Sequence, residues 1–289
     1  MNNPKIVIPF WEVIKRSFNY VFLNFSSVSR LIAVPVLVMA GGQMLFKSQG
    51  MLLQLVLLLL TAFVGVSWSR LVILNEQPRF SKVLVGCIFR YLLNYLGIAL
   101  LLLCPGILVL MGMYVFGDAA QQEQFALLAA GKGSLEGSAR ILIWPLVTVI
   151  VSSLICARLR LSLAAAAVED REIGLINAFR ISRGNTWRIY GGLIIIGLPV
   201  QILYVLVVQM VVVMPQGNQF FSAVGIIAGA ALSLVDICLK ASFDAHAYQY
   251  FTYFYHKRTE DEEAMAARTL VEEEIKHLSL IHISEPTRP

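Results

Sequence analysis

Tyr190–Val213 reads YGGLIIIGLPVQILYVLVVQMVVV, a run of twenty-four residues without a charged side chain. An α-helix rises about 1.5 Å per residue, so about 20 apolar residues cross the roughly 30 Å hydrocarbon core of a bilayer. This run is therefore long enough to span a membrane. Five further apolar runs are Arg30–Phe46, Met51–Trp68, Tyr91–Phe116, Ile141–Ala157 and Phe221–Leu239. We predict an all-α, polytopic membrane protein with six transmembrane helices.

The composition supports this fold class. Only 14% of the residues are charged and the mean hydropathy is +0.73, whereas about one quarter of the residues in soluble domains are charged. So few charges cannot cover a water-facing surface, and lipid is expected to cover much of it. We attribute the formal net charge of +5 to basic residues beside the membrane and expect no nucleic-acid partner.

Lysine and arginine are distributed unevenly about the six expected spans. Four lie at or before the start of the first span, four between the second and third, six between the fourth and fifth, and five between the sixth span and residue 277. The opposite side has only Lys47, Lys132 and Arg140. Positive residues concentrate on the cytoplasmic side of membrane proteins. We therefore expect both termini to be cytoplasmic.

A repeating unit is predicted from the order of the segments. Amphipathic segments at Phe10–Phe22, Phe80–Tyr91 and Ile173–Phe179 precede the odd-numbered spans, and we expect them to lie in the cytoplasmic interface with arginines toward anionic headgroups. The odd spans contain Pro35, Pro105 and Pro199. This order predicts a threefold parallel repeat. The alternative is that the alternation of spans alone produces the pattern.

Three regions follow from these boundaries: a six-span membrane domain at residues 1–255, an acidic cytoplasmic tail at 256–277, and a foreign segment at 278–289. The last twelve residues, LSLIHISEPTRP, match the in-frame translation of the end of a transposase-based sequencing-library adapter. We expect the protein's own sequence to be cut short near His277 and the foreign segment to be unpacked. In the loop between the third and fourth spans we expect a short helix at Gln121–Ala130.

Asp236 is the most informative charged residue, because it lies within the sixth expected span. A carboxylate in a span usually faces the bundle interior and has a partner. Lys240, Arg158 and Arg160 lie at similar depth. The three interpretations are an ion pair that joins the fourth and sixth spans, a site coupled to a proton or substrate, and simple solvation at the interface.

Metal and cofactor sites are not predicted. Asp244 and His246 are two residues apart and therefore do not face each other on a helix. The four cysteines, Cys87, Cys104, Cys156 and Cys238, form no CxxC pair, and we expect them to be small buried apolar residues.

Two elements on the basic side resemble a known family. One is Trp68-Ser-Arg70-Leu-Val-Ile-Leu-Asn-Glu-Gln-Pro78, and the other contains Arg180-Ile-Ser-Arg183-Gly-Asn-Thr-Trp187-Arg188. They are similar to the W-x-R-x-x-L-L-x-x-x-P and S-x-R-x-x-W-R-L-like elements of the membrane-domain family named after glycerophosphoryl diester phosphodiesterase. The resemblance covers most of residues 10–255. The metal-binding barrel of that enzyme has no counterpart here, so the resemblance implies a membrane module of the bacterial inner membrane without the enzyme's activity.

Three functions remain open. The first is a non-catalytic membrane module that contacts anionic lipid headgroups or a membrane protein partner, which the basic amphipathic segments favour. The second is a transporter of small solutes or lipids, in which prolines interrupt helices and Asp236 couples ions. The third is an intramembrane enzyme, for which no HExxH, GxSxG or paired-aspartate motif is present.

Overall fold

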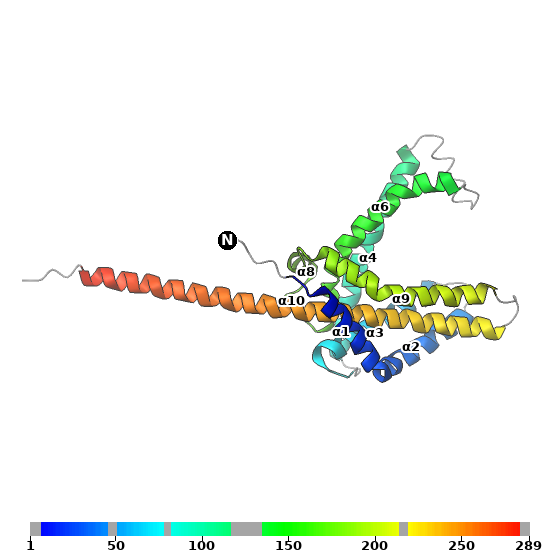
Figure 1. Ribbon diagram of the computed structural model, residues 1–289, viewed down its shortest axis with the longest axis horizontal. Coiled ribbons are helices and arrows are strands. Elements are labelled where there is room, and N and C mark those ends of the chain that lie inside the picture. The colour runs from blue at the N-terminus through cyan, green and yellow to red at the C-terminus, as the bar shows by residue number, and fades with distance from the viewer. Residues whose placement is uncertain (1–6, 46–50, 78–81, 117–134, 214–218, 284–289) are drawn as a thin grey trace, which may run out of the picture. The chain divides into compact units, whose positions relative to one another are not determined.

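The chain folds into helices only, over the residues that the structure describes. This computed structural model describes residues 7–45, 51–77, 82–116, 135–213 and 219–283 (Figure 1). The helices are α1 (Phe10–Leu23), α2 (Phe25–Leu45), α3 (Met51–Leu74), α4 (Lys82–Phe116), α6 (Leu135–Leu159), α7 (Leu161–Ala167), α8 (Leu175–Ile181), α9 (Thr186–Val213) and α10 (Gln219–Ile283).

Six of these helices are long and apolar enough to cross a membrane: α2, α3, α4, α6, α9 and α10. Many of their large apolar side chains are exposed on the surface of the protein. Contact of so much apolar surface with water would be unfavourable. Leu198, Ile202 and Leu206 of α9 are each about half exposed. Lipid is the solvent that accommodates such a surface. The prediction of an all-α polytopic membrane protein is confirmed.

The amphipathic segments before the odd spans are built in three different ways. The segment before the third span is not a separate helix, because α4 is continuous from Lys82. Its apolar residues Leu84, Cys87 and Tyr91 pack into a core with residues of α3 and α7. The segment Ile173–Phe179 overlaps the short helix α8.

The segment before the first span forms the separate helix α1, which divides its apolar residues between two environments. Val13, Ile14 and Val21 are buried, whereas Trp11 and Phe22 remain exposed. Helix α1 contacts α9 and α2.

The expected prolines lie inside the helices α2, α4 and α9. Pro145 also lies within a helix, α6, which contains an even-numbered span. Proline is therefore not restricted to the odd spans, and the threefold repeat stays a prediction.

The chain divides into two compact units, Met1–Tyr248 and Gln249–Pro289. In the second unit, Gln249–Ile283 is helical, including the acidic segment 256–277. The helix continues through Leu278–Ile283, which are half of the segment expected to be foreign. The remainder of that segment and the short helix expected at Gln121–Ala130 lie outside the described residues.

The interior of the first unit is organised around Leu234–Tyr248 of α10, which we call the central segment. Most of its side chains are buried, including the small residues Ala241, Ser242, Ala245 and Ala247. The sixth span was expected to end at Leu239, but α10 continues beyond it without a break. The small residues after Leu239 let other helices pack closely around this part of α10.

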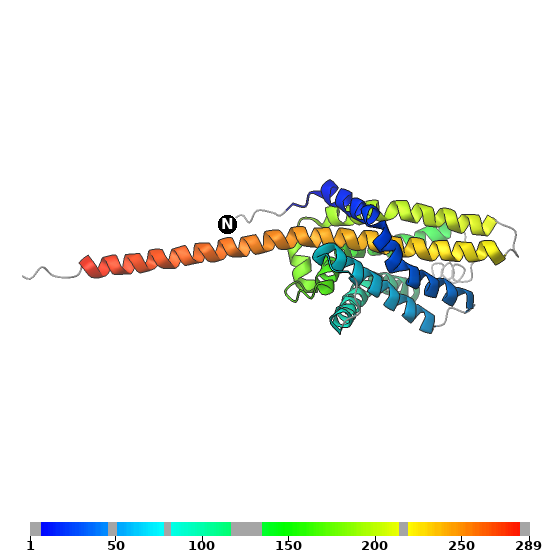
Figure 2. The ribbon, with the colours of Figure 1, turned by 90° about the horizontal axis from the view of Figure 1, so that it is seen from below.

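Helix α9 runs beside α10 in both views (Figures 1 and 2). Two glycines allow this close approach. A Cβ atom on Gly192 would overlap the ring of Phe243, and one on Gly197 would lie 3.1 Å from Cε of Lys240. Helices α9 and α10 therefore pack closely toward the end of the spans that carries Arg70 of α3, Arg158 of α6 and Arg188 of α9, which we call the basic end.

Candidate functional site

Two acidic and two basic side chains meet at the central segment. Asp236, Lys240 and Asp244 follow one another at four-residue spacing and so share one helix face. Nζ of Lys240 lies 2.5 Å from Oδ2 of Asp236. Arg160, at the junction of α6 and α7, donates to Oδ2 of Asp244 from Nη2 at 2.7 Å and from Nε at 3.0 Å. These four residues, which we call the charge cluster, carry no net formal charge.

Both carboxylates of the charge cluster are buried, and a buried carboxylate needs a cationic partner. Asp244 is 3% exposed and Asp236 is 8% exposed. A buried ion pair gains less than its Coulomb energy, because both ions lose their hydration, but leaving one ion unpaired costs much more. The forked contact of Arg160 satisfies Asp244 with two hydrogen bonds to one oxygen and a third, at 3.2 Å, to the other. The pair therefore fixes the α6–α7 junction against α10.

Further polar contacts join other elements to the central segment. Nε1 of Trp68 in α3 donates to Oγ of Ser242 at 2.6 Å. The hydroxyl of Tyr248 donates to Oδ2 of Asp170, in the loop after α7, at 2.6 Å. The ring of Tyr20 in α1 lies 5.9 Å from the imidazole ring of His246. Helix α1, helix α3 and the loop after α7 thus meet the central segment, as do the α6–α7 junction and α9.

Tyr20 also ties α1 to α3. Its hydroxyl donates to the carbonyl oxygen of Leu71 at 3.0 Å. Burial raises the pKa of Tyr20, since the phenolate would lose hydration. The hydroxyl therefore stays protonated and remains a donor.

Arg70 closes the end of the buried helix α7. Its Nη1 donates to the carbonyl oxygen of Ala167 at 3.1 Å, and its Nη2 lies 2.6 Å from Oε2 of Glu76. Glu169 completes the contacts at 3.6 Å. Carbonyl groups at a helix C-terminus have no partner within the helix and carry partial negative charge, so a guanidinium group stabilises that end.

The remaining candidate arginines and Trp187 lie toward the surface of the basic end. Arg158 sits 3.5 Å above the ring of Phe179 and donates to the backbone carbonyl of the same residue. Arg188 donates to the carbonyl oxygen of Ile8 at 2.6 Å. Arg180 and Arg183 are exposed, and Trp187 is 71% exposed.

Of the three partners expected for Asp236, the structure gives it Lys240. Arg158 turns to α8, and Arg160 pairs with Asp244 instead. The sequence does not identify that pair, because 84 residues separate its members. The available signal was the four-residue spacing of Asp244 from Lys240, which places a second carboxylate on the same helix face.

A small cavity of about 120 Å³ lies beside Asp236. Gln201 and Tyr204 of α9 and Ser233 of α10 contribute its polar lining. Oδ1 of Asp236 has no hydrogen-bond partner among the described residues. The cavity is large enough for a few waters, each of which occupies about 30 Å³ in the liquid. The arrangement can hydrate one carboxylate oxygen while the other stays paired with Lys240.

Within the described part of the chain, no three His, Cys, Asp or Glu residues are grouped to hold a metal ion. Three of the four cysteines are buried as expected, but Cys104 is exposed. Cys104 lies on α4, whose large apolar side chains are also exposed, so its thiol faces the region that lipid covers.

Comparisons of this chain with family models, with curated proteins and with solved structures found no match. The charge cluster and the basic end must therefore be interpreted from their own chemistry.

The two carboxylates should differ in their effect on stability. Asp244→Asn removes the buried carboxylate that pairs with the partly buried Arg160, and we expect it to lower the free energy of unfolding by about 3–5 kcal/mol. Asp236→Asn should cost less, because Asp236 and Lys240 make a single hydrogen bond within one helix, whereas Arg160 and Asp244 make three hydrogen bonds between two elements. Thermal and denaturant unfolding in detergent measure both effects.

Glu12→Gln is the matched control, since Glu12 pairs with Arg16 at an exposed site and such pairs contribute about 0–1 kcal/mol. Adding Arg160→Gln to Asp244→Asn should recover part of the loss. An Asp244→Asn variant as stable as Glu12→Gln would contradict a structural role for the Arg160–Asp244 pair.

Proposed function

We propose that this chain is a non-catalytic integral membrane module of the bacterial inner membrane, with both termini in the cytoplasm and its basic end in contact with anionic lipid headgroups. The resemblance to the membrane-domain family named after glycerophosphoryl diester phosphodiesterase is part of this proposal. The observation that carries it is the coincidence of exposed basic and aromatic side chains at one end of the spans.

Aromatic and basic residues together are typical of the membrane–water interface. Trp11 is 69% exposed on α1 and Trp187 is 71% exposed at the start of α9. Arg180 and Arg183 are exposed on and just after α8, with no carboxylate partner among the described residues. Each basic residue near an anionic surface contributes about 1 kcal/mol of attraction. This surface therefore suits an interface rich in anionic lipid.

The charge cluster supports a structural interpretation of most of the candidate residues. Trp68, Arg70 and Arg160 donate their hydrogen bonds to groups within the protein. The exposed side chains on α1, on α8 and at the start of α9 are available to an outside ligand.

Orientation can be measured with reporter fusions. Fusions after Pro78 and Asp170 should report a cytoplasmic location, and fusions after Lys47 and Lys132 an extracytoplasmic one, because the basic segments stay on the cytoplasmic side. An extracytoplasmic result after Asp170 would refute the orientation.

Headgroup contact can be measured on the full chain extracted into polymer nanodiscs directly from the membrane. The ratio of anionic to zwitterionic lipid around the protein should exceed that of the whole membrane. Arg180→Gln combined with Arg183→Gln should lower this ratio, whereas Arg140→Gln, near the opposite end of α6, should not. If the wild-type ratio equals that of the bulk membrane, the proposed function is wrong.

A transporter is the second candidate, and the unpaired Oδ1 of Asp236 beside its polar cavity favours it. A coupling carboxylate must be able to gain and lose a proton or cation, which a hydrated oxygen permits. The Asp236→Asn variant separates the two functions. Normal stability with loss of a cellular phenotype would support transport, whereas loss of stability alone would support the structural role.

A further inference from the structure

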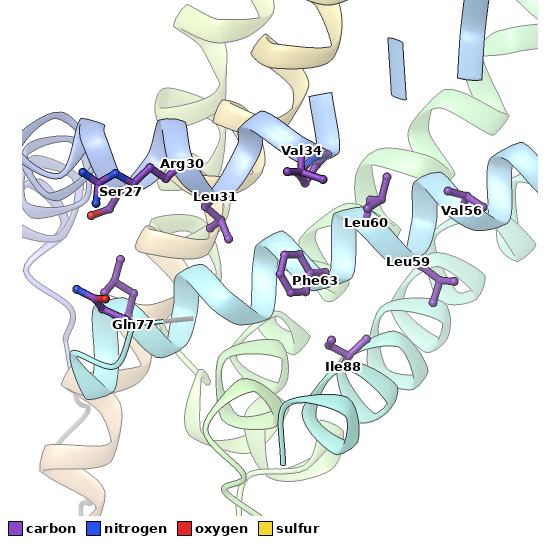
Figure 3. Close-up of a pocket in the computed structure, with 12 residues that line it drawn as sticks. Ser27, Arg30, Leu31, Val34, Val56, Leu59, Leu60, Phe63, Gln77 and Ile88 are labelled. Carbon is purple, nitrogen blue, oxygen red and sulfur yellow. The ribbon is translucent and has the colours of Figure 1, made fainter. Parts of the chain in front are cut away.

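A groove of about 790 Å³ runs along α2 and α3 and reaches Ile88 of α4 (Figure 3). We propose that it binds one anionic glycerophospholipid, with the phosphate at Arg30 and an acyl chain along its apolar part. This inference rests on the proposed function, since it assigns a specific site to headgroup contact at the basic end.

The polar and apolar linings of the groove are separated. Ser27, Arg30 and Gln77 lie toward one end of the groove, and Val56 and Leu59 lie toward the other (Figure 3). The intervening lining is apolar as well: Leu31, Val34, Pro35, Leu60, Phe63, Leu71 and Ile88. A phospholipid has the same division into a charged head and an apolar tail.

The length of the groove also suits an acyl chain. Leu71 and Val56 both line it, and they are 15 residues apart on α3, which corresponds to about 22 Å along the axis. Half of the hydrocarbon core is about 15 Å thick. A chain in the groove would therefore extend from the interface through one leaflet.

The positive charge of Arg30 favours an anionic ligand in the groove. None of the described residues that line it is acidic. Among the described residues, the side chains of Ser27, Arg30 and Gln77 make no ion pair or hydrogen bond, so their donors are available. The guanidinium group of arginine matches the oxygens of a phosphate with two parallel hydrogen bonds.

A second cavity, of about 500 Å³ between α4, α6 and α9, is less suitable for an anion. It is lined by Arg160 and Lys240, but Arg160 is paired with Asp244 and Lys240 with Asp236. An anion there would have to compete with two existing ion pairs, whereas Arg30 has none to give up.

The test measures retention of phosphatidylglycerol, with phosphatidylcholine as the zwitterionic comparison, by the full chain in native mass spectrometry from detergent. The wild type should retain about one phosphatidylglycerol and prefer it to phosphatidylcholine. Arg30→Gln should weaken retention roughly tenfold or more, because a charge-assisted hydrogen bond is lost. Arg30→Lys, which keeps the charge and loses the fork, should be intermediate.

A variant that fills the apolar part of the groove with a larger side chain provides a second, independent test. Val34→Trp places an indole in the groove and should reduce retention of the lipid, whereas Leu37→Trp, on the same helix but outside the groove lining, should not. Both residues are mostly exposed, so both variants should fold. A photoreactive benzoylphenylalanine at position 34 should form adducts with lipid. An adduct with a second protein chain would show that the groove is a protein interface and would overturn the proposal.

The outcomes distinguish this site from general headgroup contact. If Arg30→Gln loses the single retained lipid while anionic lipid is still enriched in nanodiscs, the result supports both the groove site and the proposed headgroup contact. Equal retention of the two lipids, unchanged in Arg30→Gln, overturns the groove site even where the enrichment persists. Absence of enrichment in the wild type contradicts the proposed function itself.

Discussion

The ion pair between Arg160 and Asp244 is the interaction on which the arrangement of the helix ends depends. Lipid tails are as apolar as the helices they surround, so little hydrophobic force draws spans together within a bilayer. Close packing and hydrogen bonds between helices must hold them instead. Here these contacts concentrate at the basic end, where the pair joins the α6–α7 junction to α10 and where Trp68 joins α3 to the same segment. Breaking the pair would strand a buried charge at the point where the helices converge.

The sequence predicts those features that depend on local composition. The six spans follow from apolar runs, because a helix that satisfies its own backbone is the simplest structure that can cross lipid. The pair of Asp236 with Lys240 follows from their four-residue spacing. The buried helix α7 and the partner of Arg160 could not be predicted, since both depend on contacts between segments far apart in the chain. The apolar face at the start of α4 could not be assigned from the sequence for the same reason. Its pattern is amphipathic, but whether it contacts lipid or protein depends on where α3 and α7 lie.

The basic end therefore has an inner and an outer part with different chemistry. Inside, acids and bases balance, and the residues of the charge cluster are occupied by one another. Outside, Arg180 and Arg183 have no acidic partner among the described residues, and the exposed Trp187 is typical of an interfacial side chain. The proposed function assigns lipid contact to the outer part and structural support to the inner one. The unpaired Oδ1 of Asp236 is a described feature of the inner part that charge balance alone does not explain.

The helices form a packed core at the basic end, around the central segment of α10. Hydrogen–deuterium exchange of the full chain in nanodiscs tests it most directly, because α7 and α8 are a matched pair of seven-residue helices near that end. Every residue of α7 is buried, whereas most of α8 is exposed. Amides of α7 and of Ala241–Tyr248 should exchange orders of magnitude more slowly than those of α8. Exchange of α7 as fast as that of α8 would contradict the account.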